Sequence, residues 1–146
     1  MRWVYTDGGR QEAGFEGDAR DCVCRAIAVA SQRPYRQVYD ELAAANKAAG
    51  GTRSARNGIP KKVIRKYLSD MGWTWTPTMK IGQGCKVHLT PEELPAGRII
   101  CSVSRHLCAV IDGVLHDSHD CSRGGNRCVY GYWTQDDSPA LAEVMS

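Results

Sequence analysis

The chain has 146 residues, of which 42% are hydrophobic and 24% charged, and its formal net charge is +3. These ordinary globular values exclude wholesale disorder and fit a single domain spanning residues 1–146. No apolar run approaches the roughly 20 residues that span a bilayer, and the first residues lack the apolar stretch of a signal peptide. We therefore expect a cytoplasmic protein with no membrane association.

The cysteines and the charge narrow the class further. Seven cysteines are an odd number and accompany no export signal, so we expect reduced thiols rather than a disulfide framework. The small positive charge falls well short of the clustered charge of a typical nucleic-acid-binding protein. Neither feature predicts an oligomeric state.

Helical periodicity dominates the first half of the chain. A largely buried helix is predicted over residues 21–31, beginning at Asp21, an N-cap type of residue. A second helix is predicted after Pro34 with its C-cap at residues 50–51, and a third from Pro60 to Gly72. The apolar residues that define the last two helices are Val38, Tyr39, Leu42 and Ala45, and then Val63, Ile64, Tyr67, Leu68 and Met71.

The second half of the chain is richer in β-branched and aromatic residues, which predict strands. Asp112-Gly113 between two such runs is a strong signal for a two-residue hairpin turn. Helices followed by strands predict an α+β domain, with N-terminal helices packed on a C-terminal antiparallel β-sheet. The predicted strands cover residues 73–76, 98–103, 107–111, 114–116 and 128–133.

Cys22 is placed to be a nucleophile. A thiol in the first turn of a helix lies at the positive end of the helix dipole, which favours the reactive thiolate. The free amides there can also bind an oxyanion, a contribution of about 3 kcal/mol per donor. Asp21 opposes the ionisation of this thiol. The alternative is a buried, structural Cys22, which is the role we expect for Cys24.

His106 is the candidate base among the four histidines because it opens an apolar strand. If residues 112–113 form a two-residue turn, Cys108 pairs with Asp117 and His106 with His119. Asp117 then lies diagonally across from His106 and can fix the tautomer of its ring. The alternatives are a solvated His–Asp pair without chemistry, His119 as the orienting group, and Cys108 as a weaker nucleophile.

The order of these residues resembles a known family. A cysteine at a helix N-terminus, a histidine on a strand and an aspartate on the next strand are similar to the papain-like cysteine peptidases. Residues 21–27, Asp-Cys-Val-Cys-Arg-Ala-Ile, resemble the Cys-x-x-Arg-Ala-Ile helix start of ovarian-tumour-type deubiquitinases. Residues 94–113 look like the histidine hairpin of bacteriocin-processing peptidases. The whole chain resembles small proteins of tailed phages and prophages.

The resemblance implies a papain-like fold and a cysteine hydrolase that acts on a peptide, isopeptide or other amide bond. Its catalytic residues would be Cys22, His106 and Asp117, its partner a peptide or protein substrate, and we expect no cofactor or metal. Two positions depart from the families. Papain-type enzymes carry an oxyanion-hole glutamine a few residues before the cysteine, whereas this chain has Glu16 six residues before it, and an ionised glutamate cannot donate a hydrogen bond. Ovarian-tumour-type enzymes carry an aspartate three residues before the cysteine, where this chain has Ala19. The second oxyanion donor would be a backbone amide of residues 17–19.

Three rival functions are open. One is a catalytically inactive papain-like interaction protein. Another is a metal site, for which the sequence offers N and S ligands at short spacing: Cys85, His88, His116, His119, Cys121 and Cys128. The third is a surface for nucleic acid or another acidic partner, formed by a basic stretch near Trp73 and Trp75: Arg53, Arg56, Lys61, Lys62, Arg65 and Lys66.

Overall fold

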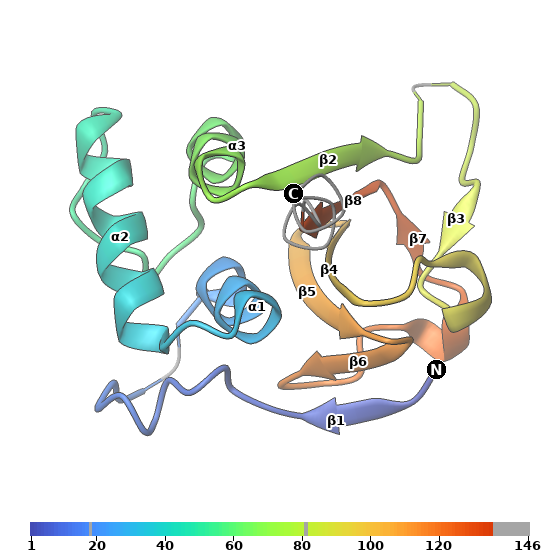
Figure 1. The fold of residues 1–146 in the computed structure, drawn as a ribbon, viewed down its shortest axis with the longest axis horizontal. Helices are drawn as coiled ribbons and strands as arrows, with labels where there is room; N and C mark the ends of the chain where they lie inside the picture. Colours follow the sequence, from blue (N-terminus) through green and yellow to red (C-terminus); the bar gives the residue numbers. More distant parts are fainter. Residues whose placement is uncertain (18, 81, 136–146) are drawn as a thin grey trace, which may run out of the picture.

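The computed structural model describes residues 1–17, 19–80 and 82–135, and this part of the chain has an α+β fold (Figure 1). Three α-helices come first, and most of the strands follow. The helices are α1 (Cys22–Ser31), α2 (Tyr35–Ala48) and α3 (Lys61–Asp70). The strands are β1 (Trp3–Tyr5), β2 (Trp73–Pro77), β3 (Val87–His88), β4 (Arg98–Val103), β5 (His106–Ile111), β6 (Val114–Asp117), β7 (Cys128–Val129) and β8 (Gly131–Gln135).

The three predicted helices are confirmed to within one or two residues at each end. Asp21 occupies the N-cap position of α1, but its side chain makes no capping hydrogen bond. Helix α2 ends at Ala48, just before the two predicted glycines, and α3 ends before Gly72, whose φ of 88° takes the chain into the left-handed region. The sharp turn into β2 therefore uses the backbone freedom of a glycine.

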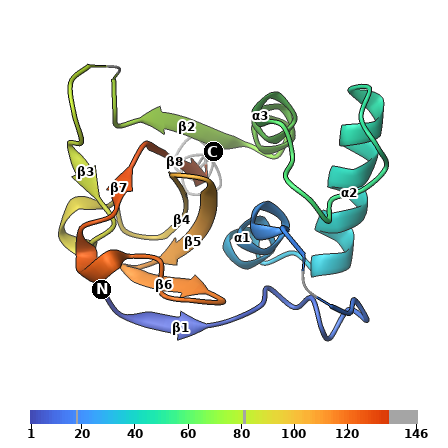
Figure 2. The same ribbon diagram turned by 180° about the vertical axis from the view of Figure 1, so that it is seen from behind.

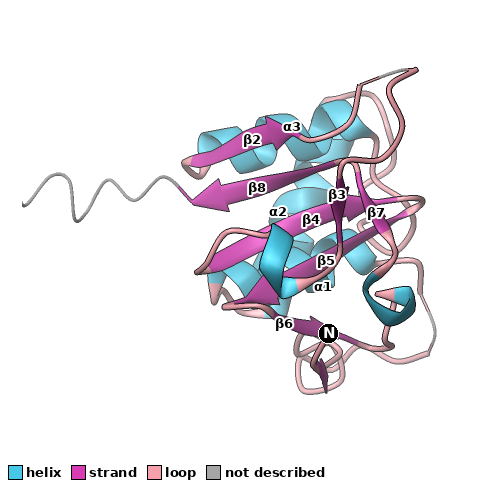
Figure 3. Cartoon of the chain, turned by 90° about the vertical axis from the view of Figure 1, so that its right-hand side faces the viewer, coloured by secondary structure: helices cyan, strands magenta, loops and turns pink. Residues whose placement is uncertain are grey.

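Six strands form one mixed sheet in the order β1-β6-β5-β4-β8-β2, and Figure 3 shows five of them from β2 down to β6. The predicted hairpin is confirmed, with Ile111 opposite Val114 and positive φ at both Asp112 and Gly113, as a type I′ turn requires. The prediction of an antiparallel sheet is wrong at one edge, because β1 pairs with β6 in parallel. A three-residue strand gives no alternation pattern from which this pairing could be predicted.

The predicted strand over residues 128–133 is divided at Tyr130. Its first part, β7, pairs with β3 in a separate two-stranded sheet, and its second part, β8, lies between β4 and β2. The β3–β7 pairing brings Cys85 and Cys128 together in a disulfide, with a Cα–Cα distance of 5.8 Å. The expectation that all seven cysteines are reduced is therefore wrong for these two.

The sheet is buried on both faces. The helices cover one face, and the β3–β7 ribbon with its loops lies on the other side, as Figures 1 and 2 show. Ile27, Leu42 and Trp133 belong to the core under the helices, whereas Val110 and Leu115 belong to the core under the ribbon. Within the described ranges no helix has the length and apolar character needed to cross a bilayer.

Candidate active site

The three predicted site residues lie at the ends of three neighbouring elements. Cys22 begins α1, His106 begins β5 and Asp117 ends β6. Strands β5 and β6 pair directly, and the core under the helices joins α1 to β5 through residues such as Ala26 and Ala109. The fold therefore brings together side chains that are up to 95 positions apart in the sequence, as the hairpin register and the helix start predict.

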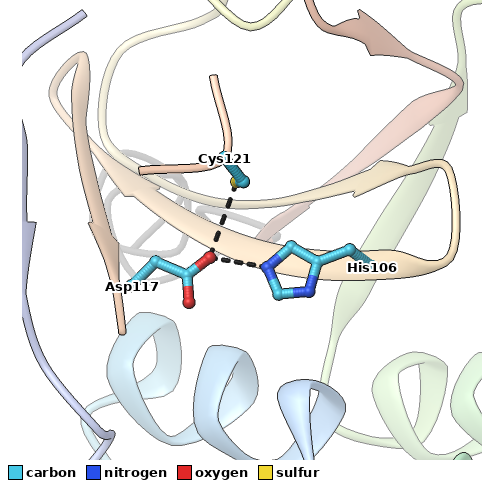
Figure 4. Close-up of side chains that lie close together, drawn as sticks. All are labelled: His106, Asp117 and Cys121. Carbon is cyan, nitrogen blue, oxygen red and sulfur yellow. Dashed lines mark hydrogen bonds and ion pairs between the residues drawn. The ribbon is translucent and has the colours of Figure 1, made fainter. Parts of the chain in front are cut away.

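His106 and Asp117 are in direct contact. Nε2 of His106 and Oδ2 of Asp117 are 2.6 Å apart, and the two side chains are only 11% and 8% exposed (Figure 4). Burial alone would lower the pKa of His106, but its hydrogen bonds with Asp117, Cys121 and Cys22 raise that pKa from 6.5 to about 11. The imidazolium form is therefore favoured.

Asp117 is held as a carboxylate. Burial opposes its ionisation, yet the hydrogen bond and charge of His106 and the backbone amide of Ser118 lower its pKa below the ordinary value. The amide of Ser118 donates to Oδ1 at 2.7 Å. Because Oδ2 faces the ring and Oδ1 is held by the amide, the carboxylate has a fixed orientation.

Cys22 is half-buried and interacts with His106. Its thiol hydrogen-bonds with His106, and the backbone N–H of Leu107 donates toward the sulfur. Burial would raise the pKa of Cys22, but these two hydrogen bonds and the positive charges of His106 and Arg25 lower it. Since Nε2 of the ring is taken by Asp117, Nδ1 is the nitrogen left to face the thiol.

A fourth side chain, Cys121, belongs to the site and was missed by the sequence analysis in this role. Its thiol donates to Oδ2 of Asp117 at 3.5 Å, as Figure 4 shows. A hydrogen bond with Cys108 and burial raise the pKa of Cys121 well above the ordinary value, so this thiol is protonated and unreactive. It follows β6 in a loop, where no strand register could have predicted its position.

Within the described ranges, one group of side chains could hold a metal ion. His106, Asp117 and Cys121 offer ligand atoms that lie within 4.8 Å of one another. This set differs from the spacings that the sequence suggested. Cys85 and Cys128 are joined in a disulfide and cannot ligate, and His88 instead pairs with Glu93 at 3.2 Å.

Asp21 is buried and is not an isolated negative charge beside the thiol. It pairs with Arg10 at 3.4 Å and with Arg25 at 3.0 Å, and accepts a hydrogen bond from the hydroxyl of Tyr35. Two guanidinium groups thus offset the carboxylate that we expected to oppose ionisation of Cys22. Arg25 also donates to the hydroxyl of Ser118 at 2.8 Å, which links α1 to the residue that fixes Asp117.

The remaining thiols and histidines near the site have other environments. Cys24 is fully buried, and burial raises its pKa to about 12, in keeping with a structural role. Cys108 is likewise buried, with its pKa raised by a hydrogen bond with Cys101. The ring of His119 lies 5.2 Å from that of His106, but the ring N–H of His106 donates to Asp117. Of the loop expected to supply a second oxyanion donor, residue 18 lies outside the described residues.

Cys22 lines a small pocket, and a larger cleft lies nearby. A cleft of about 690 Å³ lies beside the start of α1 and is lined by the segment before the helix together with Arg25 and Ser118. Leu107 lines both the small pocket that contains Cys22 and a second groove toward α3 and β2.

Comparison with protein-family models, with curated proteins and with solved structures finds no match for this chain.

Proposed function

We propose that this protein is a papain-like cysteine hydrolase that cleaves a peptide, isopeptide or other amide bond. Cys22 is the nucleophile, His106 the proton carrier and Asp117 the group that orients the imidazole. The observation that carries the proposal is the position of His106, which lies 2.6 Å from the Asp117 carboxylate and close enough to the Cys22 thiol to lower the pKa of that thiol.

The chemistry follows from the charges. The pKa of Cys22 is lowered and that of His106 is raised, so the pair favours thiolate and imidazolium. The thiolate attacks the carbonyl carbon, and the amide of Cys22 at the start of α1 donates to the resulting oxyanion. His106 then protonates the departing amine, which leaves a thioester on Cys22. Water activated by His106 hydrolyses that thioester and restores the thiol.

The test is the rate at which iodoacetamide alkylates each thiol at pH 7, followed by peptide mass spectrometry. We expect Cys22 to react at least ten times faster than any of the four other free thiols, because these four are buried. Cys22→Ser should remove the fast phase, and His106→Ala should slow it at least tenfold, since the ion pair is lost.

His88→Ala is the matched control, because His88 is also a histidine paired with a carboxylate but lies at the surface. This variant should keep the fast phase. Zinc content is measured on the same samples, since an ion on His106 would block the reaction. Slow, uniform alkylation of metal-free protein would contradict the proposal.

A further inference from the structure

The groove toward α3 and β2, which Leu107 helps to line, combines aromatic, aliphatic and basic side chains. Its walls come from α3, β2 and the ends of β4, β5 and β8, and its volume is about 100 Å³. Its lining includes Lys61, Ile64, Arg65, Trp75, Leu107 and Trp133. The structure thus brings part of the basic stretch noted in the sequence next to two indole rings.

The groove lies next to the small pocket that contains Cys22, because Leu107 lines both. Leu107 lines its inner end, and the backbone N–H of the same residue donates toward the sulfur of Cys22. A chain whose scissile bond lies at Cys22 can therefore place a neighbouring side chain in this groove.

The apolar wall of the groove consists of packed, mostly buried side chains. Trp75 and Trp133 pack against each other with ring centroids 5.1 Å apart, and Trp133 is only 4% exposed. Ile64 and Leu107, each 8% exposed, complete this wall. Pockets for drug-sized ligands have volumes of roughly 300–1,000 Å³, so this smaller groove fits a single side chain.

The rim of the groove is positive. Lys61 and Arg65 lie one turn apart on the exposed side of α3, and neither has an ion-pair partner within the described ranges. Lys66 on the same helix is instead paired with Asp70 at 3.0 Å. Two unpaired cations beside an apolar groove favour a ligand that carries an apolar side chain next to carboxylates.

From these observations we infer that the groove selects an acidic peptide segment, with one aliphatic side chain inserted between Trp75, Leu107 and Ile64 and adjacent carboxylates on Lys61 and Arg65. This inference rests on the proposed function, because it names the substrate class of that site. A single-stranded nucleic acid is disfavoured: the groove is too small for a stacked base with its sugar, and two cations do not form the continuous basic track that a backbone follows.

The test measures the binding of labelled hexapeptides to Cys22→Ala protein by fluorescence polarisation at low salt, so that no catalysis is needed. One peptide has a central leucine flanked by aspartates, a second has lysines in place of the aspartates, and a third has serine in place of the leucine. We expect the first to bind at least ten times more tightly than the other two. Lys61→Glu combined with Arg65→Glu should reverse the preference between aspartate and lysine.

Lys62→Glu combined with Lys66→Glu is the matched control on the same helix, and its preference should stay within twofold of the parent. Equal binding of the acidic and basic peptides, an unchanged preference after charge reversal, or displacement of the peptide by oligothymidine would overturn the inference. The iodoacetamide experiment separates this failure from failure of the proposed function, because it reads the Cys22 thiol without any peptide.

Discussion

The residue that connects the parts of the site is His106, and its charge state can be read from the pH dependence of Cys22. The pKa of Cys22 is lowered from 9.0, so the thiolate forms as pH rises through a value below 9.0. We predict that the rate of alkylation of Cys22 increases with pH and reaches its plateau before an ordinary thiol would. His106→Gln should move the midpoint of this curve upward, because the imidazolium no longer stabilises the thiolate.

The same profile measured on His116→Gln is the control, since His116 lies near Cys22 but is not among the groups that shift its pKa. Identical midpoints for unmodified protein and His106→Gln would show that the histidine does not lower the pKa of the Cys22 thiol.

At the scale of residues, the sequence predicted the contact of His106 with Asp117 because both belong to one hairpin. Its register follows from two turn residues, and a local rule is enough. The environment of Asp21 could not be predicted in this way. Its partners Arg10 and Tyr35 come from a loop and from another helix, so only the folded chain shows that the carboxylate is paired.

Strands β2 and β8 meet at a position where only glycine fits. A Cβ at Gly131 would lie 2.3 Å from the ring of Trp75, and the backbone oxygen of Thr76 would be 2.9 Å away. We predict that Gly131→Ala displaces the indole and lowers the free energy of unfolding by about 1–3 kcal/mol, as overpacking typically does. Urea denaturation followed by tryptophan fluorescence measures this change.

Gly58→Ala is the control for this prediction. No heavy atom lies within 4 Å of a Cβ placed at Gly58, and its φ is not in the left-handed region. A Gly131→Ala protein as stable as Gly58→Ala would mean that the indole does not pack closely against this strand.

At the scale of elements, prediction succeeded where a segment carries its own periodicity. The helices and the strands β4, β5 and β6 have apolar runs with clear turn residues at their ends. Strands β1, β3 and β7 have two or three residues each and are defined only by their partners. The disulfide between Cys85 and Cys128 was missed for the same reason, because it depends on the β3–β7 pairing.

For the whole molecule, this disulfide closes a loop with a sequence separation of 43 residues. We predict that Cys85→Ser combined with Cys128→Ser lowers the free energy of unfolding by roughly 2–4 kcal/mol, through the greater freedom of the unfolded chain. Urea denaturation without reductant measures the difference. Because disulfides persist mainly in oxidising compartments, the cytoplasmic location expected from the sequence stays a prediction.

Reductant provides the control for the disulfide. Unmodified protein in excess dithiothreitol should unfold at the same urea concentration as the double variant, and the double variant should not respond to dithiothreitol. Equal stability of the two proteins in the absence of reductant would show that the crosslink does not constrain the chain.

The parallel pairing of β1 with β6 places the start of the chain against the residue proposed to orient the imidazole. The indole N–H of Trp3 donates to the backbone oxygen of Asp117 at 3.0 Å across 114 positions, and the amide of Thr6 donates to the same oxygen at 3.0 Å. In the order of the sequence, β1 precedes its partner β6 by more than a hundred positions, whereas β6 directly follows its other partner, β5. His106 and Asp117 follow Cys22 by 84 and 95 positions, so the three side chains can come together only when β5 and β6 are present.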